Sequence, residues 1–481
     1  MRRALAVLAP LLGGFAAALG QAPWGLWWLA LAGFAIGIDA VARTRRPFLV
    51  GWLFGAAYFG LALHWITEPF FVDAAATGFL APVALGASAL GFGLFWAVGG
   101  WAGARAFGGP LGAALGLGIA EMARSYVLTG FPWALPGHVL IDTAALPAAT
   151  LAGAHGLGFA VLVGAGLVAR RGPVSVVAGL AVWAAPFAYG AALPPAPAAT
   201  GPVIRLVQPN APQHLKWDPD WIGVFFRRAL AETAAPGAPA VTVWPETSLP
   251  ELLRNSADVR ALMANAAGGG PIVAGAQRYD EARQPRNALV VLTGAEGAVA
   301  RIHDKHRLVP FGEYLPFPGL FEMVGVGPMA AQLAGIYAPG EGPALIDLPG
   351  VGPVLPMICY EAIFPQDIRR VDRPRAILHL TNDAWFGTRA GPQQHLALAR
   401  LRAAETGLPL LRAANTGVSA AIDARGRVLA ALPLGEASHL DAALPGALPP
   451  TVYARVGDAM AMLWLAALAA LLLIRRRRVS P

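Results

Sequence analysis

The sequence is poor in cysteine and in charged residues. Cys359 is the only cysteine among 481 residues, which excludes a disulfide within the chain and a metal site built from several thiolates. Charged residues make up 13% of the chain and hydrophobic residues 56%, whereas about a quarter of the residues of a typical soluble protein are charged. These scarcities indicate a membrane protein whose single thiol is either inert packing or a reactive group.

Lysine is nearly absent as well. Lys216 and Lys305 are the only lysines among 36 basic side chains, and arginine accounts for the others. Because the guanidinium group of arginine is bulkier and forked, a lysine kept in such a sequence suggests a need for a compact ammonium group. We therefore regard Lys305 as a candidate functional cation, and Lys216 as a residue retained by chance on a solvated face.

The sequence contains many long apolar segments. A segment that crosses a bilayer needs roughly 20 such residues, and windows of about this length cover residues 5–21, 24–42, 49–66, 79–104, 111–128, 147–169, 173–192 and 457–474. The first window follows two arginines as a signal peptide does, but further windows follow at once, so we interpret it as retained. The pattern predicts seven membrane spans, then a long segment outside the membrane (the excursion, from about residue 193 to 455), and one final span.

Arginine marks alternate loops between these windows. The marked segments carry Arg43, Arg45, Arg46, Arg105, Arg170, Arg171 and Arg475 to Arg478. Since positively charged loops remain in the cytoplasm, we expect both termini there and the excursion on the periplasmic side of a bacterial inner membrane. The net charge of +8 then reflects topology, and no nucleic-acid partner is expected, because no basic stripe interleaved with aromatic residues is present.

The sequence of the excursion predicts an α/β domain. Strands are predicted at "VIRLVQ", "AVTVWP", "PIVAGAQ", "ALVVLT", "VLPMIC", "AILHLT" and "LPLLRAA", and helices at "WIGVFFRRALAETA" and "PQQHLALARLRAAE". Strands that alternate with helices favour a layered α/β fold. The expected domains are residues 1–192 (seven transmembrane helices), 193–202 (linker), 203–455 (periplasmic α/β domain) and 456–481 (final helix and basic tail).

Three residues with chemical potential follow predicted strands. Glu246 follows "AVTVW", Lys305 follows "AVARIHD" and Cys359 follows "GPVLPMI", and functional groups of α/β folds gather beyond strand ends. A carboxylate can act as the base for a thiol nucleophile, and an ammonium group can stabilise the oxyanion that forms on a carbonyl. This set of residues predicts acyl transfer through a cysteine.

A Cys–His hydrolase is the competing enzymatic interpretation. The chain offers His303, His306, His379 and His395 as partners for the thiol. A histidine inside a strand or beside a turn is more often structural, so we rank this alternative below the Glu–Lys–Cys arrangement. No nucleotide motif and no clustered Cys/His site is present in the sequence, and neither a cofactor nor a metal is expected.

Five successive motifs, together with the eight spans, resemble the apolipoprotein N-acyltransferase family over essentially the whole chain. The motifs are "WPETSLP", "HDKHRLVPFGEYLPF", "ICYEAIFP", "LTNDAWFG" and "RAANTGVSAAIDARG". The resemblance implies a nitrilase-like αββα sandwich inserted before the last of eight transmembrane helices. Two departures lie in the membrane part, where Met122 replaces a usual tryptophan and His155 a common tyrosine.

The resemblance also implies roles for individual residues. Glu246 matches the general base, Lys305 the lysine that supports the oxyanion and Cys359 the nucleophile. A supporting role is implied for Glu313, Tyr360 and Glu361. Contacts with the substrate are implied for Trp217, near the lipid entrance, and for the loop residues Asn382 and Trp385.

The implied reaction has two stages. A phospholipid, typically phosphatidylethanolamine in this family, acylates the cysteine, and the thioester then acylates the α-amino group of the diacylglyceryl-cysteine at the N-terminus of an apolipoprotein. The expected partners are thus the phospholipid, the lipoprotein and the membrane, with the enzyme as a monomer. Two alternatives remain open: a membrane-bound amidase or hydrolase of the nitrilase superfamily, and a scaffold that binds lipid without turnover.

Overall fold

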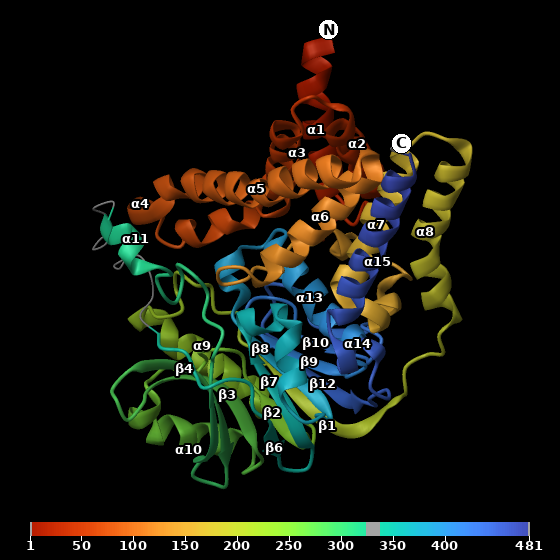
Figure 1. Cartoon of the computed structure of the whole chain (residues 1–481). Coiled ribbons are helices and arrows are strands. Elements are labelled where there is room, and N and C mark those ends of the chain that lie inside the picture. Colours follow the sequence, from red (N-terminus) through yellow and green to blue (C-terminus); the bar gives the residue numbers. More distant parts are fainter. Residues whose placement is uncertain (1, 324–336, 480–481) are drawn as a thin grey trace. The chain divides into compact units, whose positions relative to one another are not determined.

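The computed structural model describes residues 2–323 and 337–479, and these residues form two compact units. The helical unit comprises residues 1–195, 389–406 and 450–481, and the α/β unit comprises residues 196–388 and 407–449. The chain therefore passes from one unit to the other four times. Figure 1 shows the elements of both units, which are considered separately below.

The helical unit is built from eight longer helices, a ninth that comes from inside the excursion, and short connecting pieces. In the described residues the helices are α1 (Arg2–Ala18), α2 (Trp27–Arg43), α3 (Pro47–Ala62), α4 (Ala74–Thr77), α5 (Ala81–Phe107), α6 (Gly109–Tyr126), α7 (Ala149–Ala169), α8 (Pro173–Ala192), α13 (Gly391–Thr406), α14 (Val452–Val456) and α15 (Ala459–Val479). Helix α15 packs beside α7 and α6, so the last helix completes a bundle begun at the N-terminus (Figure 1).

Each of the eight predicted spans overlaps one helix of this unit. By length and apolar composition, four helical stretches of the described residues are able to cross a bilayer: 74–107, 146–169, 173–192 and 459–478. A fifth is obtained if α3 and the 3-10 helix that follows it, which are bent by 47°, are counted together. The apolar helices therefore support a membrane unit. The predicted number of eight spans is not confirmed, because only four or five helical stretches of the described residues meet these criteria.

A buried ion pair lies on helix α6 of the helical unit. Glu121 and Arg124, one turn apart on α6, form an ion pair with an O–N distance of 2.6 Å, and both are almost fully buried. The indole N–H of Trp96 donates to the same carboxylate at 2.7 Å. Because an unpaired charge is very costly in such surroundings, this pairing gives Glu121 and Arg124 a structural role.

One buried amide of α13 connects this helix to three other segments of the helical unit. The side-chain oxygen of Gln394 accepts hydrogen bonds from the indole groups of Trp65 (3.0 Å) and Trp133 (2.7 Å). Its nitrogen donates to the carbonyl oxygens of Ala22 (3.0 Å) and Ala62 (2.9 Å). All four hydrogen-bonding positions of this buried amide are thus used, and the segment groups with the helical unit although the sequence predicted it within the domain 203–455.

The α/β unit contains two six-stranded sheets. The first has the order β12-β1-β2-β3-β4-β5 and the second β11-β10-β9-β8-β7-β6. The strands are β1 (Ala199–Gln208), β2 (Val241–Val243), β3 (Ile272–Tyr279), β4 (Pro285–Thr293), β5 (Ala298–Asp304), β6 (Ile346–Leu348), β7 (Gly352–Ile358), β8 (Ala376–Thr381), β9 (Leu410–Ala414), β10 (Ala420–Ile422), β11 (Val428–Ala431) and β12 (Ser438–Pro445). All seven strands listed from the apolar runs are confirmed.

Helices of the α/β unit cover the outer face of the first sheet. The covering helices are α9 (Pro219–Thr233) and α10 (Ala257–Ala266). A third, short helix, α11 (Pro318–Met323), lies apart from these two (Figure 1). A buried apolar cluster joins Ala229 of α9 and Met263 of α10 to Val207, Ala274 and Val290 of the sheet. Burying these side chains fixes the first sheet, and so fixes the loops that leave the ends of β2 and β5.

Candidate active site

Glu246 lies just beyond β2, in a turn with little freedom. The next residue, Thr247, has a backbone φ of +48°, which is unusual for a β-branched residue. The neighbouring Gly275 of β3 leaves room for this turn, since a Cβ atom there would lie 2.5 Å from the Cα of Glu246 and 2.3 Å from the nitrogen of Thr247. The main-chain oxygen of Gly275 also accepts a hydrogen bond from Ser248 at 2.8 Å. The turn is therefore held against β3.

Lys305 follows β5 and connects two carboxylates. Its ammonium nitrogen lies 3.1 Å from Oε1 of Glu246 and 2.8 Å from Oε1 of Glu313. The side chain is 1% exposed, so it has almost no contact with solvent. Burial lowers the pKa of Lys305, but the charges of Glu246 and Glu313 outweigh this and raise the pKa well above its usual value. Lys305 is therefore a permanent cation at neutral pH.

Further donors hold the Glu246 carboxylate. Asn287 of β4 donates from Nδ2 to Oε1 at 2.8 Å, and the backbone N–H of Asn382 donates to Oε2 at 2.9 Å. Burial raises the pKa of Glu246, but the charge of Lys305 and the hydrogen bonds from Asn287 and Lys305 lower it overall. The carboxylate is thus ionised and able to accept a proton.

Asn287 was not identified from the sequence, although it bonds to both glutamates of the site. Its Nδ2 also lies 3.2 Å from Oε1 of Glu313, and its side chain is buried. The sequence feature that could have identified Asn287 is its position as a lone amide at the start of the apolar run "NALVVLT". A buried polar side chain needs a partner, and here that partner is the carboxylate pair.

Cys359 stands at the end of β7, in the second sheet. Its backbone φ is +51° and the residue is 4% exposed. Burial and the negative charge of Glu246 raise the pKa of the thiol, whereas Lys305 and a hydrogen bond with Thr381 act in the opposite direction; the net pKa is far above the ordinary value. The resting thiol is protonated, so that a base must remove its proton before it can act as a nucleophile.

Glu361 ties the loop after Lys305 to the end of β7. One carboxylate oxygen accepts hydrogen bonds from the backbone N–H groups of His306 (2.7 Å) and Arg307 (3.3 Å). The other accepts the backbone N–H of Ile358 at 2.7 Å. Burial alone would raise the pKa of the carboxyl group, but the side-chain hydrogen bond and charge of His306, the charge of His303 and the backbone bond from Ile358 lower it overall. Glu361 thereby joins the two segments that carry Lys305 and Cys359.

Glu361 and two neighbouring histidines form a group of potential metal ligands. The candidate ligand atoms of His303, His306 and Glu361 lie within 4.8 Å of one another. However, the two ring nitrogens of His306 lie 2.7 Å from Glu361 and 3.0 Å from Asp367. Burial lowers the pKa of His306, but hydrogen bonds that its ring donates to Asp367 and Glu361 raise it to about 9. A protonated imidazole between two carboxylates does not coordinate a metal, so the geometry favours a salt-bridge cluster.

The histidine alternative requires an imidazole that can accept the proton of the thiol. Nε2 of His379 lies 3.1 Å from the carbonyl oxygen of Cys359, and Nδ1 lies 2.8 Å from a guanidinium nitrogen of Arg412. Both ring nitrogens are therefore engaged, with the main chain and with a cation. His303 and His306 belong to the cluster around Glu361, and His395 lies on α13 of the helical unit.

The remaining predicted residues lie at different depths. The hydroxyl group of Tyr360 is buried and has no hydrogen-bond partner in the described residues, which favours a contribution through its backbone. Asn382 is buried and donates from Nδ2 to Gln213 at 2.8 Å in addition to its bond with Glu246. Trp217 and Trp385 are both 41% exposed.

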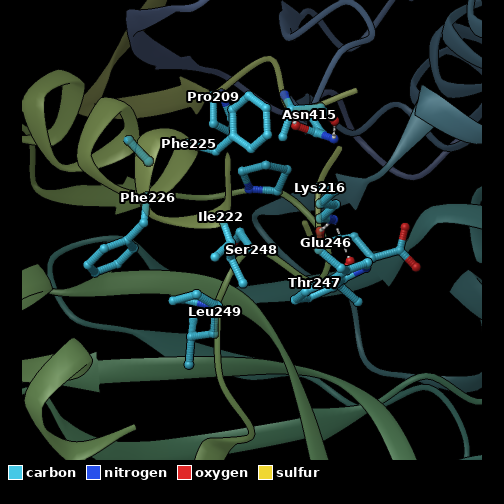
Figure 2. A pocket seen from close by; sticks show the side chains of 15 residues that line it. Pro209, Lys216, Ile222, Phe225, Phe226, Glu246, Thr247, Ser248, Leu249 and Asn415 are labelled. Atoms are coloured by element: carbon cyan, nitrogen blue, oxygen red, sulfur yellow. Dashed lines mark hydrogen bonds between the residues drawn. The ribbon is translucent and has the colours of Figure 1, made fainter. Parts of the chain in front are cut away.

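A pocket lies beside Glu246 in the first sheet (Figure 2). One side is apolar and includes Phe225 of α9 and Leu249. The other side brings together Lys216, Glu246 and Thr247. The prediction that Lys216 lies on a solvated face is wrong, since Lys216 is 7% exposed and its ammonium group donates to the Thr247 hydroxyl at 2.7 Å and to the Glu246 carbonyl at 3.2 Å. The sequence predicted the position of Lys305 after a strand, but it carried no signal for the burial of Lys216.

Comparisons with known proteins cover nearly the whole chain. Residues 13–167 match the family model described as apolipoprotein N-acyltransferase N-terminal domain, and residues 217–448 match the one described as carbon-nitrogen hydrolase. The apolipoprotein N-acyltransferase of Rhodopseudomonas palustris is 36% identical, with 97% of this chain and 94% of the relative covered. The enzyme of the same name from Caulobacter vibrioides is 37% identical, with 93% and 90% covered.

Among solved structures, an amidase from Nesterenkonia sp. AN1 is similar to part of the chain. The identity is 18% and the TM-score 0.37, with 56% of this chain and 97% of the amidase covered.

Proposed function

This chain belongs to the apolipoprotein N-acyltransferase family, and we propose that Glu246, Lys305 and Cys359 carry out its acyl transfer. The protein is an acyltransferase of the carbon-nitrogen hydrolase superfamily, with a nitrilase-like α/β unit, and acts in lipoprotein maturation at the bacterial inner membrane. The observation that carries the proposal for the residues is the buried Glu246–Lys305–Glu313 bridge, whose charges act on the Cys359 thiol.

In the first stage the phospholipid acylates the enzyme. Glu246 accepts the proton of the Cys359 thiol, and the sulfur attacks the carbonyl carbon of the ester. Lys305 and the backbone N–H of Tyr360 stabilise the oxyanion that develops. When the ester C–O bond breaks, the departing alkoxide takes the proton back from Glu246 and leaves as lysophospholipid. The acyl chain remains on Cys359 as a thioester.

In the second stage the apolipoprotein takes the acyl chain. The α-amino group of its diacylglyceryl-cysteine attacks the thioester carbonyl, and Glu246 accepts a proton from the attacking nitrogen. The C–S bond then breaks and the thiolate of Cys359 recovers a proton from Glu246. Glu313 and Glu361 act by holding Lys305 and the loops around the thiol, while Trp217, Asn382 and Trp385 contact the lipid substrates.

We further propose a topology with both termini in the cytoplasm and the α/β unit in the periplasm. Contacts inside the helical unit support it, because they join the segments that the arginine pattern assigns to one side. Arg171 lies 2.6 Å from Asp39, in the last turns of α2, and Arg476 donates to the carbonyl oxygen of Arg105 at 2.7 Å. Basic segments that are distant in sequence thus meet at the same helix ends.

The finer features belong to the same proposal. The eight longer helices are eight spans, the linker covers residues 193–202, and the catalytic domain runs to residue 455. Phosphatidylethanolamine is the donor and supplies its sn-1 chain. The enzyme acts as a monomer.

Trapping of the acyl-enzyme tests the function. Incubated with phosphatidylethanolamine alone, the purified protein should gain one acyl mass on the peptide that contains Cys359, and neutral hydroxylamine should release it. A diacylglyceryl peptide with a free α-amine should then discharge the acyl group into an amide, whereas its N-acetylated form should not. The Cys359→Ala variant is the control and should remain unlabelled.

Other outcomes identify the alternatives. Steady release of free fatty acid without any amine acceptor would identify a hydrolase. Binding of phospholipid without any label on Cys359 would identify a scaffold and would contradict the assignment of the nucleophile.

A further inference from the structure

The peptide bond between Cys359 and Tyr360 carries two groups that matter for the reaction. Its N–H belongs to Tyr360 and is the second oxyanion donor of the proposed function, whereas its C=O belongs to Cys359. This bond is trans, and in a planar trans peptide the N–H and the C=O point in opposite directions. A partner that fixes the direction of the Cys359 carbonyl therefore also fixes the direction of the oxyanion donor.

The backbone of Cys359 needs such a partner. Its φ of +51° lies in the left-handed region, which residues with a Cβ atom seldom adopt and keep only where their surroundings hold them. The carbonyl oxygen of Cys359 lies 3.1 Å from Nε2 of His379. His379 comes from the neighbouring strand β8 and is 0% exposed, so no solvent competes for this contact.

Arg412 determines which nitrogen of the His379 ring carries the proton. A guanidinium group can only donate hydrogen bonds, and Nη1 of Arg412 lies 2.8 Å from Nδ1 of His379. Nδ1 is therefore the acceptor, and the hydrogen of the neutral ring is on Nε2. A carbonyl oxygen can only accept, so the contact between Nε2 and the Cys359 oxygen requires the same tautomer.

Arg412 is itself held in place. It is the partner of His379 in the register of β8 and β9. Its second terminal nitrogen forms an ion pair with the Asp383 carboxylate, and both of these side chains are 0% exposed. Its Nε donates to the carbonyl oxygen of Val418 at 3.2 Å. Because paired polar networks inside a protein are rigid, the donor nitrogen of His379 has a defined position.

We propose that His379 is a positioning residue whose hydrogen bond to the Cys359 carbonyl directs the N–H of Tyr360 at the oxyanion of the reacting ester. This inference rests on the proposed function, because it takes Cys359 as the nucleophile and the Tyr360 N–H as an oxyanion donor. His379 neither contacts the substrate nor exchanges a proton with the thiol. Arg412 acts one step further away, by fixing the tautomer of His379.

Two reactions of the Cys359 thiol distinguish this role from an effect on the thiol itself. Acylation by phosphatidylethanolamine passes through an oxyanion on the ester carbonyl. Alkylation by iodoacetamide forms a bond between the sulfur and a saturated carbon and expels iodide, so that no oxyanion develops. Both reactions require the thiol to lose its proton. A loss confined to acylation therefore reports on the oxyanion donor.

The His379→Asn variant tests the inference. The oxygen of the asparagine side chain can replace Nδ1 as the acceptor for Arg412, but the side chain is too short to donate to the Cys359 carbonyl. Acylation at saturating phosphatidylethanolamine should be at least about tenfold slower, which is part of the hundredfold to thousandfold cost of losing a whole oxyanion donor. The half-saturating lipid concentration should not change, because the oxyanion develops only in the transition state. Alkylation should keep the wild-type rate.

His379→Gln is the rescue variant. Its amide nitrogen extends about as far from the backbone as Nε2 and can donate to the same carbonyl, so most of the acylation rate should return. His439→Asn is the matched control, since Nδ1 of His439 contacts Glu232 at 2.7 Å in the same unit and its replacement should leave both rates unchanged. Circular dichroism and a melting curve establish that each variant is folded.

Three results would overturn the inference. A folded His379→Asn protein that acylates at the wild-type rate would show that the carbonyl needs no such partner. An equal loss of alkylation and acylation would place the effect on the thiol. A His379→Gln protein as slow as His379→Asn would show that the donated hydrogen bond is not what matters. Failure of the proposed function is distinguishable, because the wild-type protein would then form no thioester on Cys359 although iodoacetamide still alkylates it.

Discussion

The substitution Gly275→Ala tests how closely the position of Glu246 governs the reaction. The added Cβ atom would lie 2.5 Å from the Cα of Glu246 and 2.3 Å from the backbone nitrogen of Thr247, whereas ordinary contacts begin near 3.4 Å. Because both contacts are with backbone atoms, rotation of a side chain cannot relieve them. The turn must therefore move by about 1 Å, and a misplacement of this size costs roughly a hundredfold in rate.

The same clash has a smaller effect on stability. Overpacking of this kind costs about 1–3 kcal/mol, which a protein with the usual 5–15 kcal/mol survives. We thus expect a folded protein that forms the Cys359 thioester about a hundredfold more slowly. The assay is single-turnover acylation by phosphatidylethanolamine, followed by mass spectrometry, with a melting curve recorded on the same sample.

Gly319→Ala is the matched control, since a Cβ atom at Gly319 meets no other atom within 4 Å. It adds the same methyl group to the same unit and should leave the acylation rate unchanged. A Gly275→Ala protein that melts normally and acylates at the wild-type rate would refute the reasoning, because Glu246 would then tolerate a displacement of its backbone.

Three further predictions follow from other residues. Lys305→Arg should lose at least about a hundredfold in acylation, because the forked guanidinium cannot occupy the place of an ammonium between two carboxylates; near-normal turnover would show that Lys305 is misassigned. A reporter active only in the periplasm should work when fused near Pro197 and be silent after Arg46, and the reverse result would refute the topology. His306 contributes stability that is complete below its ordinary pKa of 6.5 and is lost as the pH rises through its folded pKa of about 9, so the melting temperature of His306→Gln should depend less on pH between 6.5 and 9 than that of the wild-type protein.

The sequence predicted the sheets well where burial leaves a strong pattern. Strands such as β4 and β8 are continuous apolar runs because both of their faces are covered. The strands missing from that list include β6 and β10, which have only three residues each. Strand β2 is equally short but lies within the longer run "AVTVWP", which made it recognisable. Helix α10 was also missed, because its single buried stripe is short.

The candidate site was predictable to the extent that it follows strand ends. Glu246, Lys305 and Cys359 were identified by residue type and position, and the ion pairs among Glu246, Lys305 and Glu313 agree with that selection. Asn287 and Lys216 were not, because each is held by a partner on a different segment. Pairing between distant segments depends on the packing of the whole unit, and a local pattern carries no trace of it.

The placement of α13 has a consequence for the order of synthesis. A ribosome completes residues 1–195 of the helical unit long before it reaches Gln394, and most of the α/β unit is made in between. Until then the indole groups of Trp65 and Trp133 lack the acceptor that they share in the finished protein. The hydrogen bonds between these indole groups and Gln394 can therefore form only after residues 196–388 of the α/β unit have been synthesised.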